Sequence, residues 1–209
     1  MADSTPTKKS ACASIGIYNS ADWCSGQTTL PGVRRRVYFI PKGDIVTWPK
    51  LPVIAGAKTM EEIASYVGNF VLAADKKWLH IDVLDTKSNI ESDSQGDKPS
   101  RTFLNKLTLK HAGKDEAATG FCRQANSDEL IYLVQQRNGK FRVVGSDAFD
   151  TDTKPTQKSG EGTTGESGTD LAVEATDVCP APFYPGKIET EDGDISGVDG
   201  SAWVEKAGS

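Results

Sequence analysis

The segment Glu129–Gly145, ELIYLVQQRNGKFRVVG, carries the strongest local signal of secondary structure in the sequence. It joins two β-rich runs, Leu130–Arg137 and Lys140–Val144, through the pair Asn138-Gly139. Asparagine followed by glycine tolerates the positive φ angles of a type I′ turn, and this pair between β-rich runs is a strong local signal for a hairpin. We therefore predict an antiparallel β-hairpin of this type within a mainly β protein.

Other segments carry the same signals of β-structure, either alternation of apolar and polar residues or a short continuous apolar run. The predicted strands are Val37–Ile40, Asn69–Ala73, Trp78–Leu84, Thr102–His111 and Thr169–Thr176. In the third of these, the alternation places Leu79, Ile81 and Val83 toward a core. Trp78 belongs to the opposite, more polar face.

One helix is predicted at Asp115–Asn126, DEAATGFCRQAN. Small and apolar residues recur there at helical spacing, and Asp115 and Glu116 stand at the N-terminal end, where the helix dipole favours carboxylates. Thr59 and Glu62 form a capping-box pattern that opens at most a turn or two of further helix. The predicted class is a β-sandwich or partial barrel with one flanking α-helix.

Composition bounds what the chain can be. Its 209 residues are enough to bury a core without disulfides or a metal, and 20 glycines and 10 prolines favour a loop-rich β protein over a helical bundle. The mean hydropathy of −0.43 and the lack of any run near the roughly 18 apolar residues of a membrane span exclude a membrane protein. The net charge of −5 divides into +4 for residues 1–149 and −9 for residues 150–209, which carry 4 basic and 13 acidic side chains.

Both ends of the chain read as extended arms. The apolar run Ala11–Ile17 is short, is interrupted by serine and has no cleavage site after it, so residues 1–23 are expected to be an N-terminal arm made in a cytoplasm. Residues 187–209 are acidic and carry few apolar anchors, and they are expected to form a C-terminal arm. Residues 24–186 remain as the folded domain.

No motif indicates a cofactor or a metal. Gly160, Gly162 and Gly165 have the G-x-G-x-x-G spacing of a dinucleotide site, but no core strand precedes them and no helix follows, so they are interpreted as a flexible loop. The acidic segment Glu189–Gly200 lacks the oxygen register of a calcium loop. The four cysteines form no C-x-x-C pair, and His80 and His111 are the only histidines. We expect no cofactor, no metal and no enzymatic activity.

Three polar stretches suggest contacts with other molecules. Asp85–Arg101 is a long polar excursion between two strands, and Ser146–Thr169 is a low-complexity loop. Such long loops in compact domains are usually functional or disordered. The cluster Arg34–Arg36 is either a polar start to a strand or a subunit contact with the acidic C-terminal region of a neighbouring copy.

The order of these segments is that of a known family. The strand RRVYFIPKGDI, the strand NKLTLKH, the helix, the block DELIYLVQQRNGKFRVVGSD and the ending TDLAVEATDVCPAPFY follow one another along the chain. This layout resembles the tail tube (major tail) proteins of tailed bacteriophages, in particular those of phages and prophages of Bacteroidota. The resemblance covers Cys24–Tyr184, and its most specific parts are Asp128–Gly145 and Ala181-Pro182-Phe183.

The resemblance implies a structural virion protein with no active site. Such proteins form hexameric rings whose inner sheets join into a continuous barrel, and the rings stack into a hollow tail tube. The tube encloses a tape-measure protein, conducts double-stranded DNA without specific binding, and adjoins sheath, terminator and baseplate proteins. By this resemblance the chain is made in the bacterial host cytoplasm, ends in the phage tail and does not insert into a membrane.

The resemblance also assigns candidate contact residues. Asp85–Arg101 would reach a neighbouring ring, as the stacking loop of the family does. The implied inter-ring contacts are Ser88, Asn89, Glu91, Asp93, Gln95, Asp97 and Lys98. The candidate inter-subunit contacts are Arg34, Arg35, Arg36 and Trp203.

Two alternatives stay open at this point. One is another β-rich virion component, namely a capsid decoration protein, a head–tail connector or a tail terminator. The other is a carbohydrate-binding β-sandwich module, which usually presents a flat platform of aromatic side chains. The tryptophans of this chain are scattered over different elements, which argues against the second alternative. They are Trp23, Trp48, Trp78 and Trp203.

Overall fold

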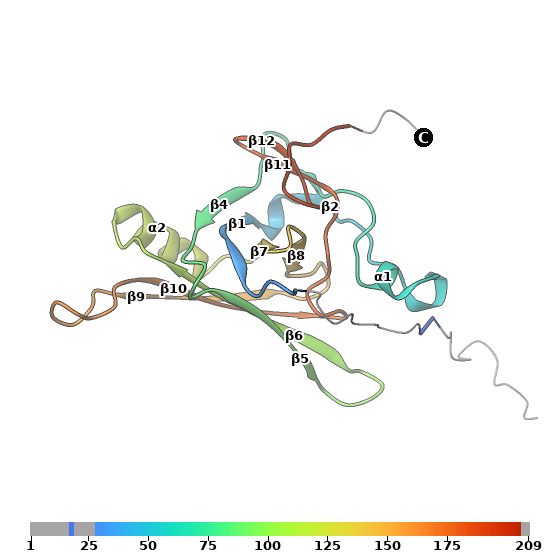
Figure 1. Cartoon of the computed structure of the whole chain (residues 1–209), viewed down its shortest axis with the longest axis horizontal. Coiled ribbons are helices and arrows are strands. Elements are labelled where there is room, and N and C mark those ends of the chain that lie inside the picture. Colours follow the sequence, from blue (N-terminus) through green and yellow to red (C-terminus); the bar gives the residue numbers. More distant parts are fainter. Residues whose placement is uncertain (1–16, 19–27, 206–209) are drawn as a thin grey trace, which may run out of the picture.

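The computed structural model describes residues 17–18 and 28–205, and within them the protein is mainly β and sandwich-like (Figure 1). Two four-stranded antiparallel sheets dominate this part of the chain. The first sheet has the order β4-β1-β7-β8, with bounds Leu79–Asp82, Val33–Pro41, Leu130–Gln136 and Phe141–Val144. The second has the order β5-β6-β10-β9, with bounds Asn89–Gln95, Thr102–His111, Gly168–Asp177 and Thr151–Lys158.

Smaller elements cover the first sheet. The two-stranded pairs are β2 with β3 (Ile45–Thr47 and Val71–Leu72) and β11 with β12 (Lys187–Thr190 and Gly193–Ser196). Short 3₁₀ turns stand at Lys42–Asp44 and Ile54–Gly56. The described α-helices are α1, Met60–Ile63, and α2, Glu116–Ala125.

Strand β7 is buried on both faces. Its residues Leu130, Tyr132 and Val134 belong to a core between the two sheets, whereas Ile131 and Leu133 belong to a second core on the other side of the first sheet. All five are 3% exposed or less. A strand covered on both faces needs apolar residues at every position, which is why this segment reads as the continuous run LIYLV.

The core between the sheets takes alternate residues from the second sheet. Leu107 and Leu109 of β6 lie beside Leu171 and Val173 of β10, in an antiparallel register that pairs Leu109 with Leu171. Helix α2 closes this core at one side, where Phe121 packs edge-to-face on Phe39 with ring centroids 5.1 Å apart. The intervening residues of both strands point away from the core, so the second sheet has one apolar and one polar face.

The second core is rich in aromatic side chains. Phe70 lies at its centre, with ring centroids 5.3 Å from both Trp48 and Trp78 and 4.9 Å from Tyr184. The Tyr184 hydroxyl donates to the Lys187 carbonyl at 2.6 Å and accepts from the Phe70 amide at 3.1 Å, so the buried polar end of the ring is satisfied. These contacts hold the C-terminal segments against the first sheet.

Local predictions with a clear signal are confirmed. The predicted hairpin is β7–β8, and the predicted helix is α2, whose N-terminal cap Asp115 accepts a hydrogen bond from the Ala118 amide at 2.9 Å. The prediction of a type I′ turn is wrong, because that turn needs a positive φ at both central residues. Gly139 has a φ of +94°, but Asn138 is not among the residues with positive φ. The Gly139 amide donates to the Gln136 carbonyl at 2.9 Å, which closes a turn around residues 137–138 before the left-handed glycine.

Four other predictions need correction. Asp85–Arg101 is not a loop, because it contains β5, and Ser146–Thr169 contains β9. Trp78 is 1% exposed and Leu79 is 41% exposed, which is the reverse of the facing predicted for these two residues, whereas Ile81 and Val83 pack on the first core as predicted. The C-terminal segment 187–209 is not only an arm, because its β11–β12 hairpin places Ile188 in the second core with no exposed surface. Most of the predicted N-terminal arm, residues 1–23, lies outside the described residues.

One carboxylate is buried without a cation. Asp177, at the end of β10, is 4% exposed, and one of its oxygens accepts from the Val178 amide at 2.6 Å. The other oxygen, Oδ2, is buried without a hydrogen-bond partner. Burial raises the pKa of Asp177 to about 6, although the amides of Val178 and Cys179 act in the opposite direction.

This carboxylate gives a prediction about pH and stability. Because its pKa is higher in the folded state, its contribution is full below the unfolded-state pKa near 3.8 and is lost as the pH rises through about 6. The change in the free energy of unfolding caused by Asp177→Asn should therefore be about 2 kcal/mol more favourable at pH 7.5 than at pH 4.5. Denaturant unfolding at the two pH values measures this difference. The exposed control Asp97→Asn should differ by less than about 0.5 kcal/mol, and an equal difference for both variants would contradict the assignment.

Candidate assembly surface

The second sheet presents a continuous polar face on the side away from the core. We call it the charged face, and the strand registers assign its residues. They are Asn89, Glu91, Asp93 and Gln95 of β5; Thr102, Leu104, Lys106, Thr108 and Lys110 of β6; Asp170, Ala172, Glu174 and Thr176 of β10; and Asp152, Lys154, Thr156 and Lys158 of β9. Five of these side chains are acidic and four are lysines, so the face is close to neutral.

The lysines of this face are paired with carboxylates of the same face. Lys106 Nζ lies 2.8 Å from Asp93 Oδ2, and Lys154 Nζ lies 2.7 Å from Asp152 Oδ2 and 3.6 Å from Glu174 Oε2. Exposed pairs of this kind contribute little to stability, about 0–1 kcal/mol each. Their effect is to distribute the charge, so that no cluster of like sign forms along these strands.

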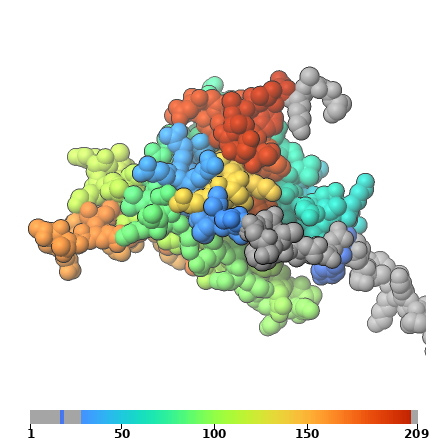
Figure 2. Space-filling model, viewed as in Figure 1, coloured from blue at the N-terminus to red at the C-terminus, as the bar shows by residue number. Residues whose placement is uncertain are grey.

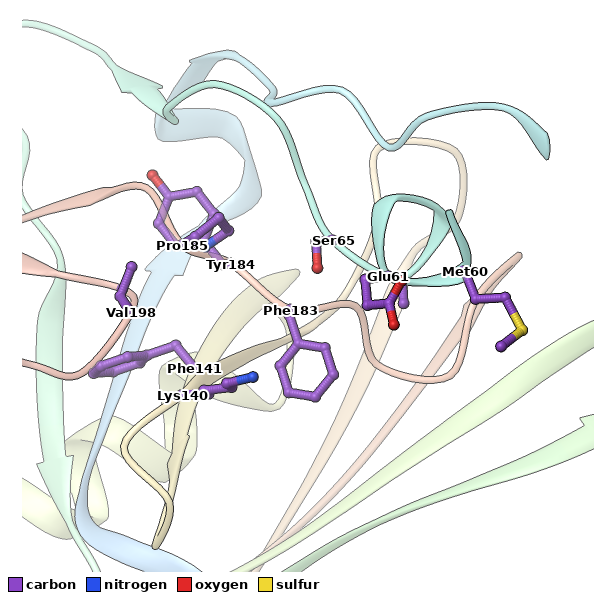
Figure 3. Close-up of a pocket in the computed structure, with 11 residues that line it drawn as sticks. Met60, Glu61, Ser65, Lys140, Phe141, Phe183, Tyr184, Pro185 and Val198 are labelled. Carbon is purple, nitrogen blue, oxygen red and sulfur yellow. The ribbon is translucent and has the colours of Figure 1, made fainter. Parts of the chain in front are cut away.

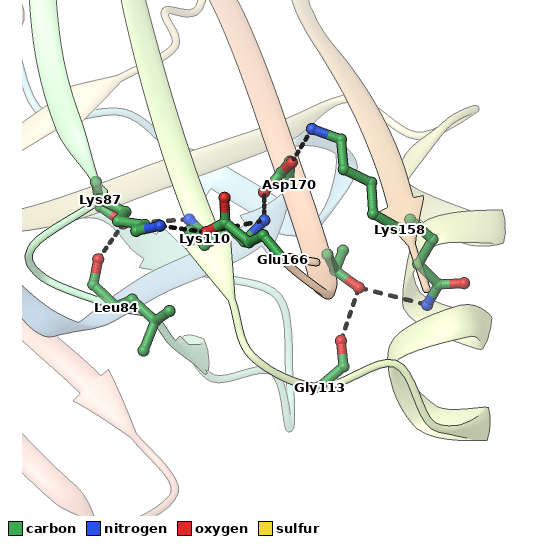
Figure 4. A network of polar contacts seen from close by, with 10 residues as sticks. Leu84, Lys87, Lys110, Gly113, Lys158, Glu166 and Asp170 are labelled. Atoms are coloured by element: carbon green, nitrogen blue, oxygen red, sulfur yellow. Dashed lines mark hydrogen bonds and ion pairs between the residues drawn. The ribbon is translucent and has the colours of Figure 1, made fainter. Parts of the chain in front are cut away.

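Lys110 is the buried exception. Its side chain is 6% exposed, and its Nζ lies 2.6 Å from Asp170 Oδ1 and 3.8 Å from Glu166 Oε1 (Figure 4). Lys158 Nζ reaches the other oxygen of Asp170 at 2.9 Å, and Lys87 pairs with Glu166. Burial by itself would raise the pKa of Asp170, but the hydrogen bonds and charges of Lys110 and Lys158 outweigh it and the pKa is lowered. This network therefore fixes the end of the sheet next to the β9–β10 turn.

The edges of the two sheets differ. Strand β8 of the first sheet is covered by the chain itself, because the Val143 amide donates to the Pro182 carbonyl at 2.9 Å and the Tyr184 amide to the Phe141 carbonyl at 3.0 Å. The opposite side of that sheet meets β11 where the Trp78 amide donates to Glu189 at 2.8 Å. In the second sheet, the described residues make no backbone hydrogen bond to the outer sides of β5 and β9, although the Thr119 hydroxyl of α2 donates to Gln157 Oε1 of β9 at 3.2 Å. Open edges of this kind can pair with another chain.

The two hairpin turns of the second sheet lie at its opposite ends. The register pairs Phe103 with Asp177 at one end and His111 with Thr169 at the other. The β5–β6 turn, residues 96–101, therefore projects from the first end and the β9–β10 turn, residues 159–167, from the second, as Figure 2 shows in green and orange. We call them the β5–β6 tip and the β9–β10 tip.

The tips have opposite charges. The β5–β6 tip carries Asp97, Lys98 and Arg101, a net charge of +1. The β9–β10 tip carries Glu161 and Glu166, a net charge of −2. The predicted loop glycines Gly160, Gly162 and Gly165 all lie in this second tip, between two strands of one sheet. The two tips thus differ in the sign of their charge, although Glu166 is already paired with Lys87 and Lys110 of its own chain.

The structure divides the predicted inter-ring residues into three groups. Asn89, Glu91, Asp93 and Gln95 lie on the charged face of the edge strand β5, and Asp97 and Lys98 lie in the β5–β6 tip. Ser88 is 5% exposed and is used within the chain, since its hydroxyl donates to the Leu84 carbonyl at 2.9 Å and accepts from the Lys110 amide at 3.1 Å. We therefore leave Ser88 out of the candidate contacts.

The predicted inter-subunit residues are partly used inside the chain. Arg36 pairs with Asp82 at 3.3 Å and with Asp192 at 3.0 Å, so it does contact the acidic C-terminal region, but that of its own chain. Arg34 and Arg35 are exposed at the start of β1. Trp203 is partly buried, and its amide donates to the Asp194 carbonyl at 2.9 Å.

The structure also bears on other kinds of site. In the described part of the chain, no group of three or more histidine, cysteine, aspartate or glutamate side chains is placed to hold a metal ion. Trp48 and Trp78 pack around Phe70 in the second core and form no exposed platform. None of the described helices is long and apolar enough to cross a lipid bilayer.

Sequence reasoning missed β5 and β9, which make the two open edges. A signal for β9 was present, since Thr151 and Thr153 face the core and alternate with Asp152 and Lys154. In β5 the only apolar residue is Ile90, so the period-2 pattern is hidden among serine, aspartate and glutamate. Both strands are more polar than an interior strand, as edge strands often are.

Comparison with known protein families, with curated proteins and with solved structures gave no match to this chain.

The Lys110 network predicts unequal roles for two lysines on the same strand and face. Lys110→Met leaves Asp170 and Glu166 without their most buried partner and should lower the free energy of unfolding by about 1–3 kcal/mol. Lys106→Met removes only an exposed pair and should lower the free energy of unfolding much less than Lys110→Met does. Denaturant unfolding of both variants measures the difference. Equal losses would show that burial of Lys110 does not strengthen this network.

Proposed function

We propose that this chain is a structural tail tube protein of a phage virion, which self-assembles into stacked rings and forms a conduit for DNA. The observation that carries the proposal is the second sheet, which combines a nearly neutral solvent-facing surface with two open edges on opposite sides. The layout of the sequence, which resembles that of tail tube proteins, supports the same assignment.

The strand directions suit ring closure. Every neighbouring pair in the order β5-β6-β10-β9 is antiparallel, so β5 and β9 run in opposite directions. When copies are related by rotation about an axis roughly along the strands, β9 of one copy meets β5 of the next in antiparallel orientation. Such a head-to-tail contact repeats until the ring closes, and a closed barrel has no free edge. The resemblance implies six copies in each ring.

Charge favours pairing between these two edges over pairing of one edge with itself. On the charged face, β5 carries Glu91 and Asp93, a net charge of −2, and β9 carries Asp152, Lys154 and Lys158, a net charge of +1. Pro155 and these lysines are the features with which edge strands avoid indiscriminate pairing. The carboxylates of β5 offset the lysines of β9, whereas a second β9 would bring like charges together. The edges are thus complementary in sign.

A tube lined by the charged face would let DNA pass without holding it. Attraction between phosphate groups and free lysine or arginine side chains is what retains nucleic acid on a protein surface. The lysines of this face are already paired with carboxylates. Before DNA passes, the same lumen would hold the tape-measure protein.

The tips supply a contact between rings. Because they project from opposite ends of the sheet, the β5–β6 tip of one ring would meet the end of the next ring that carries the β9–β10 tip. Lys98 and Arg101 would then approach Glu161, with opposite charges facing each other. Asp97 belongs to the same contact. The proposed contact between rings is therefore the β5–β6 tip and not the whole segment Asp85–Arg101, since β5 is part of the sheet.

The remaining parts of the proposal follow from this placement. Helix α2 would flank the barrel, and the terminal segments, with Arg34, Arg35 and Trp203, would lie at contacts between subunits. The partners are further copies of the chain, the tape-measure protein, and the terminator, baseplate and sheath proteins of a phage tail. The location is the virion, after synthesis in the bacterial cytoplasm, and the role needs neither catalysis nor a cofactor.

The proposal predicts assembly by the purified protein and its dependence on the sheet edges. Negative-stain electron microscopy with light scattering should detect rings or hollow tubes. Glu91→Lys replaces one of the two carboxylates of β5 by a cation on the edge that would meet the net positive β9, and should raise the concentration needed for assembly by about tenfold. The double variant with Lys154→Glu should restore most of the loss.

Glu129→Lys is the matched control, since Glu129 is exposed and lies outside both edge strands and outside the terminal segments. It should assemble like the unmodified chain. Assembly of Glu91→Lys at the unmodified concentration would contradict pairing through β5, and a chain that stays monomeric at all concentrations and binds capsids would favour a decoration protein instead.

The tips predict a separate effect on stacking. Lys98→Glu should leave single rings intact and reduce their stacking into tubes by about tenfold, because two acidic tips would then face each other. Adding Glu161→Lys should restore stacking. Tube lengths in electron micrographs provide the measurement. Tubes of normal length from Lys98→Glu alone would exclude the β5–β6 tip as the stacking contact.

A further inference from the structure

An apolar pocket lies away from the second sheet and has no role in the proposed tube. It has a volume of about 440 Å³ and is formed by α1, the start of β8 and two C-terminal segments (Figure 3). Its apolar lining includes Met60, Ala64, Phe141, Phe183, Pro185 and Val198. Glu61 and Lys140 add one charge of each sign. This size and this lining suit an aromatic or large apolar side chain.

The pocket is already formed in the chain. Backbone hydrogen bonds join its walls, from the Phe183 amide to the Ala64 carbonyl at 2.8 Å and from the Phe141 amide to the Gly197 carbonyl at 3.2 Å. The Arg142 guanidinium stacks on the Phe183 ring, 4.2 Å from its centroid, and holds that ring in place. Binding would therefore cost little free energy for ordering the pocket.

The N-terminal segment leaves the fold next to this pocket. The Gly32 carbonyl accepts from the Arg137 amide at 3.3 Å, at the turn whose other end, Lys140, lines the pocket. Residues 28–32 are exposed. The chain before them thus starts within one hairpin turn of the pocket, and residues 19–27 lie outside the described part.

That segment contains one large aromatic side chain suited to such a site. Trp23 stands in the sequence SADWCSG, where its neighbours are small or polar. The other three tryptophans have places in the fold, because Trp78 is 1% exposed and Trp48 and Trp203 are partly buried. The nine residue steps from Trp23 to Gly32 span at most about 30 Å, which is ample to reach the pocket.

We propose that the pocket binds the N-terminal segment of this chain through the Trp23 side chain. The segment enters beside Lys140, and the indole lies against Phe183 and Val198. Burial of the indole supplies the free energy of binding, since a buried aromatic side chain removes roughly 150–250 Å² of surface from water. The site is independent of the charged face, so it does not depend on the proposed tube.

Disulfide trapping in the full-length protein tests this proposal, with Cys24 as a native probe next to Trp23. In a background with Cys12→Ser, Cys122→Ser and Cys179→Ala, Val198→Cys places a thiol at the pocket, and Val178→Cys places one at a site outside it. The two positions are similarly exposed, at 54% and 66%. Under mild oxidation Cys24 should couple to the thiol of Val198→Cys at least about fivefold faster than to that of Val178→Cys, because binding raises its local concentration.

Trp23→Ser in the Val198→Cys protein should remove the preference while leaving Cys24 in place. Mass spectrometry of the disulfide-linked peptides identifies the coupled residues, and a non-reducing gel shows whether the segment binds its own chain or a neighbouring copy. Equal coupling at the two positions would overturn the proposal. A preference that survives Trp23→Ser would overturn the role of Trp23.

Discussion

The rest of the structure depends on the burial of β7 between two cores. Its five apolar side chains face the second sheet on one side and the aromatic cluster around Phe70 on the other. In most strands a slip of one residue is opposed because it would expose the apolar face, but β7 is apolar on both faces. A polar contact marks its register instead, since the Tyr132 hydroxyl lies 3.0 Å from Thr153 Oγ1 of β9 inside the first core. This contact also ties the interior strand to an edge of the second sheet.

The two sheets consequently have different roles. In the first sheet, the chain covers the β8 edge with Pro182–Tyr184. Asn105 of β6 fixes the residues just before this segment by accepting from the Ala181 amide at 2.9 Å and donating to the Cys179 carbonyl at 3.3 Å. The second sheet has an apolar face on the first core, a charge-balanced face toward solvent and two open edges. The proposed ring rests on these two edges, because open strand edges can pair with another chain.

Elements whose signal lies in neighbouring residues can be predicted from the sequence. The hairpin β7–β8, the helix α2 with its Asp115 cap, and the alternating strands β6 and β10 each depend on neighbouring residues, and they were predicted. Other features depend on residues far apart in the chain. The burial of Trp78 requires the C-terminal segment, whose amphipathic hairpin has only Ile188 and Ile195 to indicate it. The pairing of Lys110 with Asp170 joins strands 60 residues apart, so the charge balance of the face could not be derived from composition. Edge strands are the hardest to predict, because the side chains that keep them from aggregating also hide their alternation.

The proposed ring requires copies of this chain to pair through the open edges of the second sheet. Hydrogen exchange of the backbone amides, compared between unassembled and assembled protein, tests it most directly, because amides become protected when they enter a ladder. If copies pair in this way, the amides of Asn89–Gln95 and Thr151–Lys158 will gain protection from exchange on assembly, whereas those of β7 will be protected in both states. Assemblies in which these two strands exchange as fast as in the unassembled protein would contradict it.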